Sequence, residues 1–485
     1  ESGKIYGFRG KNGSGKTMLM RAIAGLIKVT GTVDINGSIN VSLEGSSNFS
    51  RNGGMAVGAF SEIDGLIISG AGNTINLQGL SNVSGVSGEE TVTGIDVSGS
   101  NNVNVSGHST VDASTLRGQV SLVSAYDGAT VTLNTDSVID VSGVLLNTNY
   151  YYTSAILLAK DAGTQINNYG AINATTSQEL IKAQNGAAVT NFGTITALPG
   201  EDEDSDSKVG LVRASGKGSS VTNAAGGTIT LVSATTPMSS DGEGDYAIPW
   251  HNRVYFALMA DNYGVASNEA GATVNLQGAG TYGVAVTKGT ASNAGEINVD
   301  GFIPTLDENG TIIDKTFWQA DQIFLMAGGM LVGSTNSPRQ TWGDGTGLNT
   351  GTINVNNEGF GMLAAKGGTV TNQGTINLTS DEGITEKHNN QLFGMGAIEG
   401  GVAINDTTGV INIDTALGQA FYNDGTGTVI NYGTICTFKV CQNPSEHNPS
   451  DNFVTLIYTG GDVITAEGET LTLDKKAQII DSAPG

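Results

Sequence analysis

The sequence predicts an all-β fold, a right-handed parallel β-helix (a solenoid) with loop insertions at one corner. Three observations indicate it: a short repeat that recurs nine times, β-branched residues at alternating positions in each copy, and a composition rich in glycine. The 485 residues include 71 glycines and 8 prolines, and only 14% are charged. This balance is typical of short strands joined by tight turns, and it argues against disorder, which needs high charge and few aliphatic residues.

The repeat consists of an apolar strand, a second short strand that ends in Asn, and a turn into a strand of the form GTIxV. A unit this small cannot bury its own apolar face, but stacked copies form a continuous core. We expect the Asn to adopt the left-handed conformation and to hydrogen-bond to its copies in the next coils. The nine repeats are marked by Asn168, Asn191, Asn223, Asn268, Asn293, Asn349, Asn372, Asn405 and Asn431.

The spacing of these asparagines separates coils from insertions. The shortest interval is 23 residues, which we take as one bare coil, so the chain holds about a dozen coils. Most of the additional residues follow the GTIxV strand, and insertions at one corner stack into one wall, the usual binding surface of a solenoid. These insertions are Leu198–Ser207, Ala234–Asn252, Gly301–Thr316 and Ser380–Asn390, with a second place of insertion at Ser334–Gly347.

A row of polar residues precedes the repeated Asn by about six positions. It contains three lysines in a chain with only 22 basic residues, and one strand per coil separates it from the insertions. We expect a shallow groove there that holds a glycan, although a polar row is also what any solenoid corner requires. The row contains Asn185, Lys217, Asn262, Lys366 and Glu399, with Asp161, Lys288 and Asp424 within one position.

All three tryptophans lie in the insertions or directly after one, in a chain with 6% aromatic residues. Aromatic rings stack on sugar rings or anchor protein partners, so we add them and their neighbours to the expected ligand site. The alternative is that each Trp fills the base of its own loop. The added residues are Trp250, Asn252, Arg253, Trp318 and Trp342.

The two cysteines, Cys436 and Cys441, lie five positions apart in CTFKVC. This spacing favours a small disulfide loop formed in an oxidising compartment over a redox or zinc motif. We therefore divide the chain into residues 1–37, a β-helix over 38–435, and C-terminal coils with the disulfide loop over 436–485.

Residues 1–37 contain a phosphate-binding loop pattern at Gly10, Gly15, Lys16 and Thr17. This segment resembles the start of an ABC-transporter ATPase domain. No signature motif or second acidic residue for the metal follows it, and β-helix coils replace the parallel sheet that such a loop needs. We interpret the segment as a fusion, an artefact or a non-catalytic cap, and we expect no nucleotide hydrolysis.

Charge and the absence of catalytic patterns restrict the function. The net charge of −24 disfavours nucleic acid and anionic lipid as partners. The four histidines are scattered, and the acidic run Glu201–Asp206 lies in a Gly- and Pro-bounded loop, whereas a glycosidase needs two carboxylates on rigid elements. We expect no metal, no cofactor and no enzymatic activity.

The NxGTIxV coils, the acidic Gly-, Asn- and Thr-rich composition and the cysteine pair resemble the passenger domains of bacterial autotransporters, most closely UpaB-like adhesins. The resemblance covers about residues 38–485. It implies export through the outer membrane by a C-terminal β-barrel that this sequence does not include, and display on the cell surface as a monomer. It also implies binding of host glycosaminoglycan and fibronectin. The alternatives are a polysaccharide lyase or glycoside hydrolase on the same fold, and a structural spacer.

Overall fold

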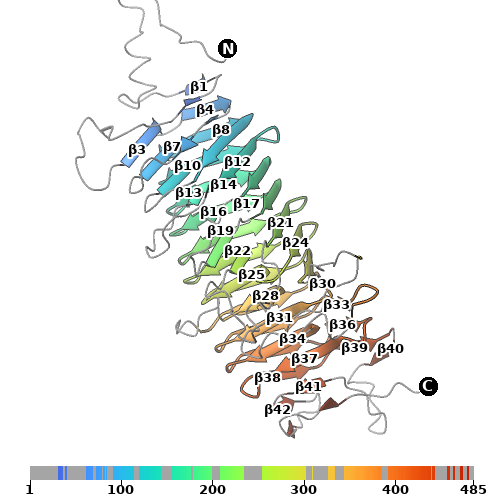
Figure 1. Ribbon diagram of the computed structural model, residues 1–485. Helices are drawn as coiled ribbons and strands as arrows, with labels where there is room; N and C mark the ends of the chain where they lie inside the picture. The colour runs from blue at the N-terminus through green and yellow to red at the C-terminus, as the bar shows by residue number, and fades with distance from the viewer. Residues whose placement is uncertain are drawn as a thin grey trace, which may run out of the picture. The chain divides into compact units, whose positions relative to one another are not determined.

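The chain folds into two compact units, residues 1–205 with 211–221 and residues 206–210 with 222–485. Each unit of this computed structural model is a right-handed parallel β-helix, which confirms the predicted fold class (Figure 1). The structure describes residues 31–35, 39–40, 62–68, 73–78, 80–81, 83–84, 91–113, 119–143, 155–175, 179–198, 208–233, 254–301, 309, 326–333, 343–384, 392–438, 440–442, 456–458, 462–464, 470–472 and 478–479.

Every complete coil of the first unit contributes one strand to each of three sheets, which we number in chain order. Sheet 1 contains β3 (Glu62–Ile68), β7 (Thr91–Ser98), β10 (Gln119–Tyr126), β13 (Ala155–Lys160), β16 (Glu179–Gln184) and residues 211–215 of β19 (Lys208–Ser215). Sheet 2 contains β1 (Gly31–Ile35), β4 (Asn73–Gln78), β8 (Asn102–Ser106), β11 (Thr130–Leu133), β14 (Gln165–Asn168) and β17 (Ala188–Asn191). Sheet 3 contains β6 (Val83–Ser84), β9 (His108–Asp112), β12 (Val138–Ser142), β15 (Ala171–Ala174) and β18 (Thr194–Ala197). A separate pair is formed by β2 (Ile39–Asn40) and β5 (Leu80–Ser81), and β20 (Ser220–Asn223) is divided between the units.

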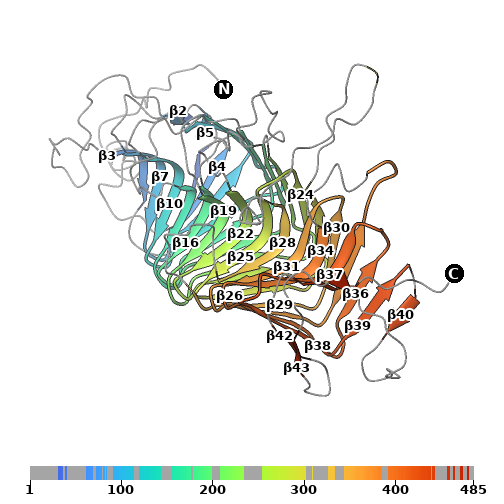
Figure 2. The same cartoon turned by 60° about the horizontal axis from the view of Figure 1, so that its bottom comes forward.

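The second unit repeats the three-sheet arrangement, with sheet 3 on a different side from sheet 1 (Figure 2). Sheet 1 contains β22 (Val254–Asp261), β25 (Thr281–Thr287), β28 (Gly328–Val332), β31 (Gly359–Ala365), β34 (Leu392–Ile398), β37 (Gly418–Asn423), β41 (Leu456–Tyr458) and β44 (Gln478–Ile479). Sheet 2 contains β23 (Val265–Asn268), β26 (Thr290–Asn293), β29 (Thr346–Asn349), β32 (Thr369–Asn372), β35 (Val402–Asn405), β38 (Thr428–Asn431), β42 (Asp462–Ile464) and β43 (Thr470–Thr472). Sheet 3 contains β21 (Thr228–Val232), β24 (Thr273–Gln277), β27 (Glu296–Asp300), β30 (Thr352–Asn356), β33 (Thr375–Thr379), β36 (Val410–Ile413), β39 (Thr434–Thr437) and β40 (Val440–Gln442).

The last strand of each sheet in the second unit reverses direction. β40 pairs antiparallel with β39, β43 with β42, and β44 with β41. Cys436 of β39 lies opposite Cys441 of β40 and is disulfide-bonded, and the chain has only these two cysteines. A strand folded back on a sheet edge covers backbone groups that would otherwise be open to pairing with another chain.

The predicted Asn repeat forms a ladder of buried side chains at the corner between sheets 2 and 3. In the first unit Asn168 Nδ2 donates to Asn191 Oδ1 at 2.7 Å. In the second unit each Asn donates to the next one along the chain, from Asn223 to Asn431, at 2.8–2.9 Å. The expected hydrogen bonds are therefore present. The expected left-handed conformation is wrong, because none of the nine asparagines has a positive φ angle, and most of the non-glycine residues that do have one lie at the other end of sheet 2.

The insertions and the N-terminal segment can be placed relative to the sheets. The four insertions connect sheet 3 to sheet 1, as the spacing predicted, and the second place of insertion connects sheet 1 to sheet 2. Most residues of the insertions lie outside the described part of the chain, as do the phosphate-loop residues 10–17. Within residues 1–37, β1 pairs parallel with β4 and thus belongs to the solenoid. The described residues include no helix long and apolar enough to cross a membrane.

Candidate functional site

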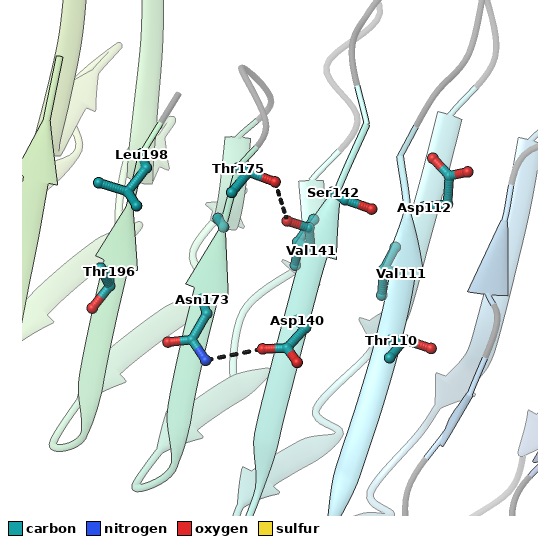
Figure 3. A pocket seen from close by; sticks show the side chains of 11 residues that line it. Thr110, Val111, Asp112, Asp140, Val141, Ser142, Asn173, Thr175, Thr196 and Leu198 are labelled. Carbon is teal, nitrogen blue, oxygen red and sulfur yellow. Dashed lines mark hydrogen bonds between the residues drawn. The ribbon is translucent and has the colours of Figure 1, made fainter. Parts of the chain in front are cut away.

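The outer face of sheet 3 in the first unit carries a hollow of about 590 Å³ (Figure 3). Strands β9, β12, β15 and β18 form its floor, and their residues alternate between buried, mostly aliphatic side chains and outward, mostly polar ones. The lining residues are Thr110, Val111, Asp112, Asp140, Val141, Ser142, Asn173, Ala174, Thr175, Thr196 and Leu198.

The strand register places the outward side chains in rows that cross the coils. Asp140 lies opposite Thr110 on one side and Asn173 on the other, and Asn173 lies opposite Thr196. Because parallel strands are about 4.8 Å apart, each row presents one polar group per coil at this interval. The hollow thus offers hydroxyl, amide and carboxylate groups in a fixed order.

Hydrogen bonds hold the carboxylate at the centre of the hollow. Asn173 Nδ2 donates to Asp140 Oδ1 at 2.9 Å, and His108 Nε2 lies 2.7 Å from Asp140 Oδ2. The hydrogen bond from Asn173, then that from His108, lowers the pKa of Asp140 below its ordinary value of 3.8, although desolvation acts in the opposite direction. The carboxylate is therefore ionised at neutral pH and accepts hydrogen bonds without acting as an acid.

Two stacked aromatic rings lie at the start of the strands that end in the hollow. Tyr169 and Phe192 immediately precede the turns into β15 and β18, with ring centroids 4.6 Å apart and planes within 3°. They are 43% and 36% exposed. The turns pack closely, since a Cβ on Gly193 would lie 2.1 Å from the carbonyl oxygen of Gly170.

The predicted polar row occupies the corner between sheets 1 and 2, at the position where the backbone is left-handed. Asn185, Asn262, Lys288 and Lys366 have φ angles of 49–52°. Lys217 lies between Gly216 and Gly218, which carry the positive φ angles in its turn. Asn tolerates this conformation well, so the turn itself accounts for the asparagines of the row without a ligand, whereas Lys adopts it rarely and the turn does not explain the lysines.

In the second unit the lysines of this row alternate with acids. Backbone hydrogen bonds place Asp344 between Lys288 and Lys366, at 2.8 Å and 3.3 Å. Lys366 Nζ lies 3.8 Å from Glu399 Oε2. Lys217 belongs to the first unit and is exposed. A sulfated glycan on the row would thus meet a carboxylate beside each lysine of the second unit.

The strand between the polar row and the insertions belongs to sheet 1, and its residues are buried. In the second unit its outer face carries an aromatic ladder, with centroids 5.2–5.8 Å apart. The rings point away from the core, because a Cβ on the adjacent Gly361 would lie 2.7 Å from the core residue Ile376. The ladder consists of Phe256, Tyr282, Phe360, Phe393 and Tyr422.

The glycan groove beside the polar row stays a prediction. Sheet 1 offers no open polar floor in the described part of the second unit, and Trp250, Asn252, Arg253, Trp318 and Trp342 lie outside the described residues. The described residues also contain no cluster of three or more His, Cys, Asp or Glu side chains placed to hold a metal.

Sequence reasoning missed the hollow and the aromatic pair, although a signal for the pair was present. Two neighbouring repeats read Asn-Tyr-Gly and Asn-Phe-Gly at positions 168 and 191, one bare coil apart. Side chains at equivalent positions of successive coils stack, so an aromatic residue in both predicts a ring pair. The hollow had no comparable signal, because its polar residues occupy ordinary outward strand positions.

Comparison with known proteins identifies the family. Residues 121–409 match the model of the BigA third pectate lyase-like domain. The chain belongs to this family. A second match, to the ABC transporter family, covers residues 1–62 and agrees with the resemblance of the N-terminal segment. Over 386 residues the chain is 42% identical to BigA of Salmonella typhimurium strain LT2, described as a surface-exposed virulence protein. The alignment covers 78% of this chain and 19% of BigA, so the chain spans about a fifth of that relative.

Proposed function

We propose that this domain is a non-enzymatic, adhesin-type module of a bacterial surface protein, and that it binds a glycan on its outer face. The observation that carries the proposal is the open hollow on sheet 3 of the first unit, where four successive coils present polar groups. The description of BigA as a surface-exposed virulence protein supports the location. Glycosaminoglycan and fibronectin, which the autotransporter resemblance implied, stay predictions.

The chemistry of the hollow favours binding over catalysis. Glycoside hydrolysis needs one carboxyl group with a raised pKa to act as the acid. The pKa of Asp140 is lowered instead, because Asn173 and His108 hold its ionised form. Lysine and arginine are missing from the lining residues, so this site offers no such group as a catalytic base.

The proposal is tested by a glycan array paired with an assay for released oligosaccharide, both on the full chain. We expect retention of at least one glycan class with no product released. The double variant Asn173→Ala/Thr196→Ala should weaken retention about tenfold, which corresponds to a loss of about 1.4 kcal/mol. Thr352→Ala, which removes an outward hydroxyl from sheet 3 of the second unit, is the matched control and should bind normally.

Two results would overturn the proposal. If the intact chain retains no glycan on the array, the domain is not a glycan-binding module, and the result favours the interpretation as a structural spacer. If shortened or unsaturated oligosaccharides accumulate with the intact chain, and the double variant abolishes them, the hollow is the active site of an enzyme.

A further inference from the structure

We infer that the ligand of the hollow is an uncharged, hydroxyl-rich oligosaccharide that lies along β15 and β18 and packs a sugar ring against the exposed part of the Tyr169–Phe192 pair. This inference rests on the proposed function and narrows it. It departs from the sulfated glycosaminoglycan that the sequence predicted, and it places the ligand on sheet 3 instead of on the lysine row.

Charge is the first argument. The residues that line the hollow include the carboxylates of Asp112 and Asp140 and no lysine or arginine. A sulfate or uronate group entering this space would be repelled by both carboxylates and neutralised by neither. Uncharged hydroxyl groups, in contrast, donate hydrogen bonds to carboxylates and exchange them with Asn173, Ser142 and Thr196.

The aromatic pair is the second argument. Exposed aromatic rings bind the apolar faces of sugars, and few other aromatic side chains are as exposed among the described residues. The only other aromatic side chains at least 36% exposed among the described residues are Tyr263 and Phe438, at 67% and 57%, both in the second unit. Tyr169 and Phe192 are the exposed aromatics that stack on each other.

The distance between the two features suits one ligand. Asn173 follows Tyr169 by four residues and Thr196 follows Phe192 by four, which limits the separation of the Cα atoms in each pair to at most about 13 Å. The outward residues between them are Ala171 and Thr194, whose short side chains leave the strand surface open. A short oligosaccharide can therefore span from the aromatic pair to the hollow, with one sugar ring on the pair.

The experiment compares neutral and sulfated probes on the full chain. Binding of neutral hexose and N-acetylhexosamine oligosaccharides, and of a heparin oligosaccharide, is measured by microarray and then by calorimetry at low and high salt. We expect a neutral oligosaccharide to bind with little dependence on salt, since no ion pair forms. Tyr169→Ala should weaken binding about tenfold, and Tyr169→Phe, which keeps the ring, should leave it unchanged.

The matched control is Tyr263→Ala, which removes an exposed tyrosine from the second unit and should bind like the unmodified chain. Circular dichroism shows whether each variant is folded, and Phe192→Ala, which removes the other ring of the pair, takes the place of Tyr169→Ala if that variant unfolds. Heparin binding that is lost in Lys217→Ala/Lys288→Ala/Lys366→Ala and unaffected by Tyr169→Ala would overturn this inference, while the proposed function would survive. Neutral binding unaffected by Tyr169→Ala would also overturn it. If the intact chain binds no glycan, both this inference and the proposed function are overturned.

Discussion

The outer face of sheet 1 is buried in both units, but it is built from opposite kinds of side chain. In the first unit Glu179 and Lys182 of β16 and Arg213 of β19 form a cluster in which Glu179 pairs with both cations. Glu179 and Lys182 are 8% and 1% exposed. In the second unit the same face carries the aromatic ladder. One backbone arrangement thus accommodates either ions or rings.

The ionic cluster and the aromatic ladder differ in why a single substitution lowers the free energy of unfolding. Buried rings contribute by burial and dispersion, so the cost of removing one depends on the cavity left behind. Buried ions contribute only as a set, because each charge that loses its partner keeps its desolvation penalty. The comparison therefore predicts that a substitution in either the ionic cluster or the aromatic ladder lowers the free energy of unfolding strongly, for different reasons. Substitutions of equivalent groups on solvent-exposed faces should lower it only slightly.

The largest effect is expected in the aromatic ladder. Phe360→Ala removes a fully buried ring that stacks on Phe393, and should lower the free energy of unfolding by about 3–5 kcal/mol. Denaturant unfolding followed by circular dichroism measures it. Tyr263→Ala, at a 67% exposed side chain, should change stability by less than about 0.5 kcal/mol. If Phe360→Ala lowers the free energy of unfolding as little as Tyr263→Ala does, the aromatic ladder does not stabilise the second unit.

The ionic cluster should be next. Glu179→Gln preserves shape but removes the carboxylate that lies 3.2 Å from Lys182 Nζ, and should cost about 3 kcal/mol. The same exchange at Glu399, whose partner Lys366 is 3.8 Å away at a corner open to solvent, should cost less than about 1 kcal/mol. If denaturant midpoints for the two variants coincide, burial of the cluster has no energetic consequence.

The asparagine ladders allow the same comparison between a buried and a half-buried position. Asn372 is fully buried and bonds to Asn349 and Asn405. Asn377, on the outer face of sheet 3, bonds to Asn354 and Asn412. Asn372→Ala should cost about 2–3 kcal/mol, and Asn377→Ala about 1 kcal/mol, because water can replace partners only at the second. Thermal unfolding of the two variants side by side would reveal a reversed order.

The smallest effect is expected for the open ion pair of the hollow. His108 and Asp140 have side chains 59% and 48% exposed, so solvent weakens their interaction. The folded-state pKa of Asp140 is lowered, and its contribution is therefore present above the unfolded-state value and lost as pH falls through the folded-state value. Asp140→Asn should lower stability by less than about 1 kcal/mol at pH 5, with the difference vanishing on acidification below both values. A carboxyl titration by NMR that places Asp140 above 3.8 would contradict this.

The sequence was sufficient to predict the fold, because the repeat itself makes the core. Asn372 and its copies share a fixed position in every coil, and equivalent positions in a solenoid must stack. The insertions between sheets 3 and 1 could be located for the same reason. The left-handed residue was assigned to the wrong corner, since Asn is common at both ends of sheet 2 and composition alone does not separate a ladder Asn from a turn residue such as Asn185.

The site was less predictable, because it depends on side chains without a repeat of their own. The lysine row was visible as a pattern, but the acid between two of its lysines was overlooked, although Asp344 precedes Asn349 by the same five positions that separate Lys288 from Asn293. The buried face of sheet 1 was also beyond prediction. Alternating apolar residues indicate one buried face, and only the structure, in which Phe360 and Leu363 belong to one buried cluster, shows that the second face is covered too.

The two asparagine ladders of the second unit point in opposite directions along the stack. In the buried ladder each amide nitrogen donates toward the C-terminal coil, as from Asn349 to Asn372. On the outer face each donates toward the N-terminal coil, as from Asn377 to Asn354. Side-chain amides are dipoles, so the dipoles of the two ladders point in opposite directions and their fields oppose each other at a distance. A coil added in reverse at the C-terminal end would place a donor against a donor in the buried ladder and an acceptor against an acceptor in the outer ladder, which gives the stack a sense of direction independent of the backbone.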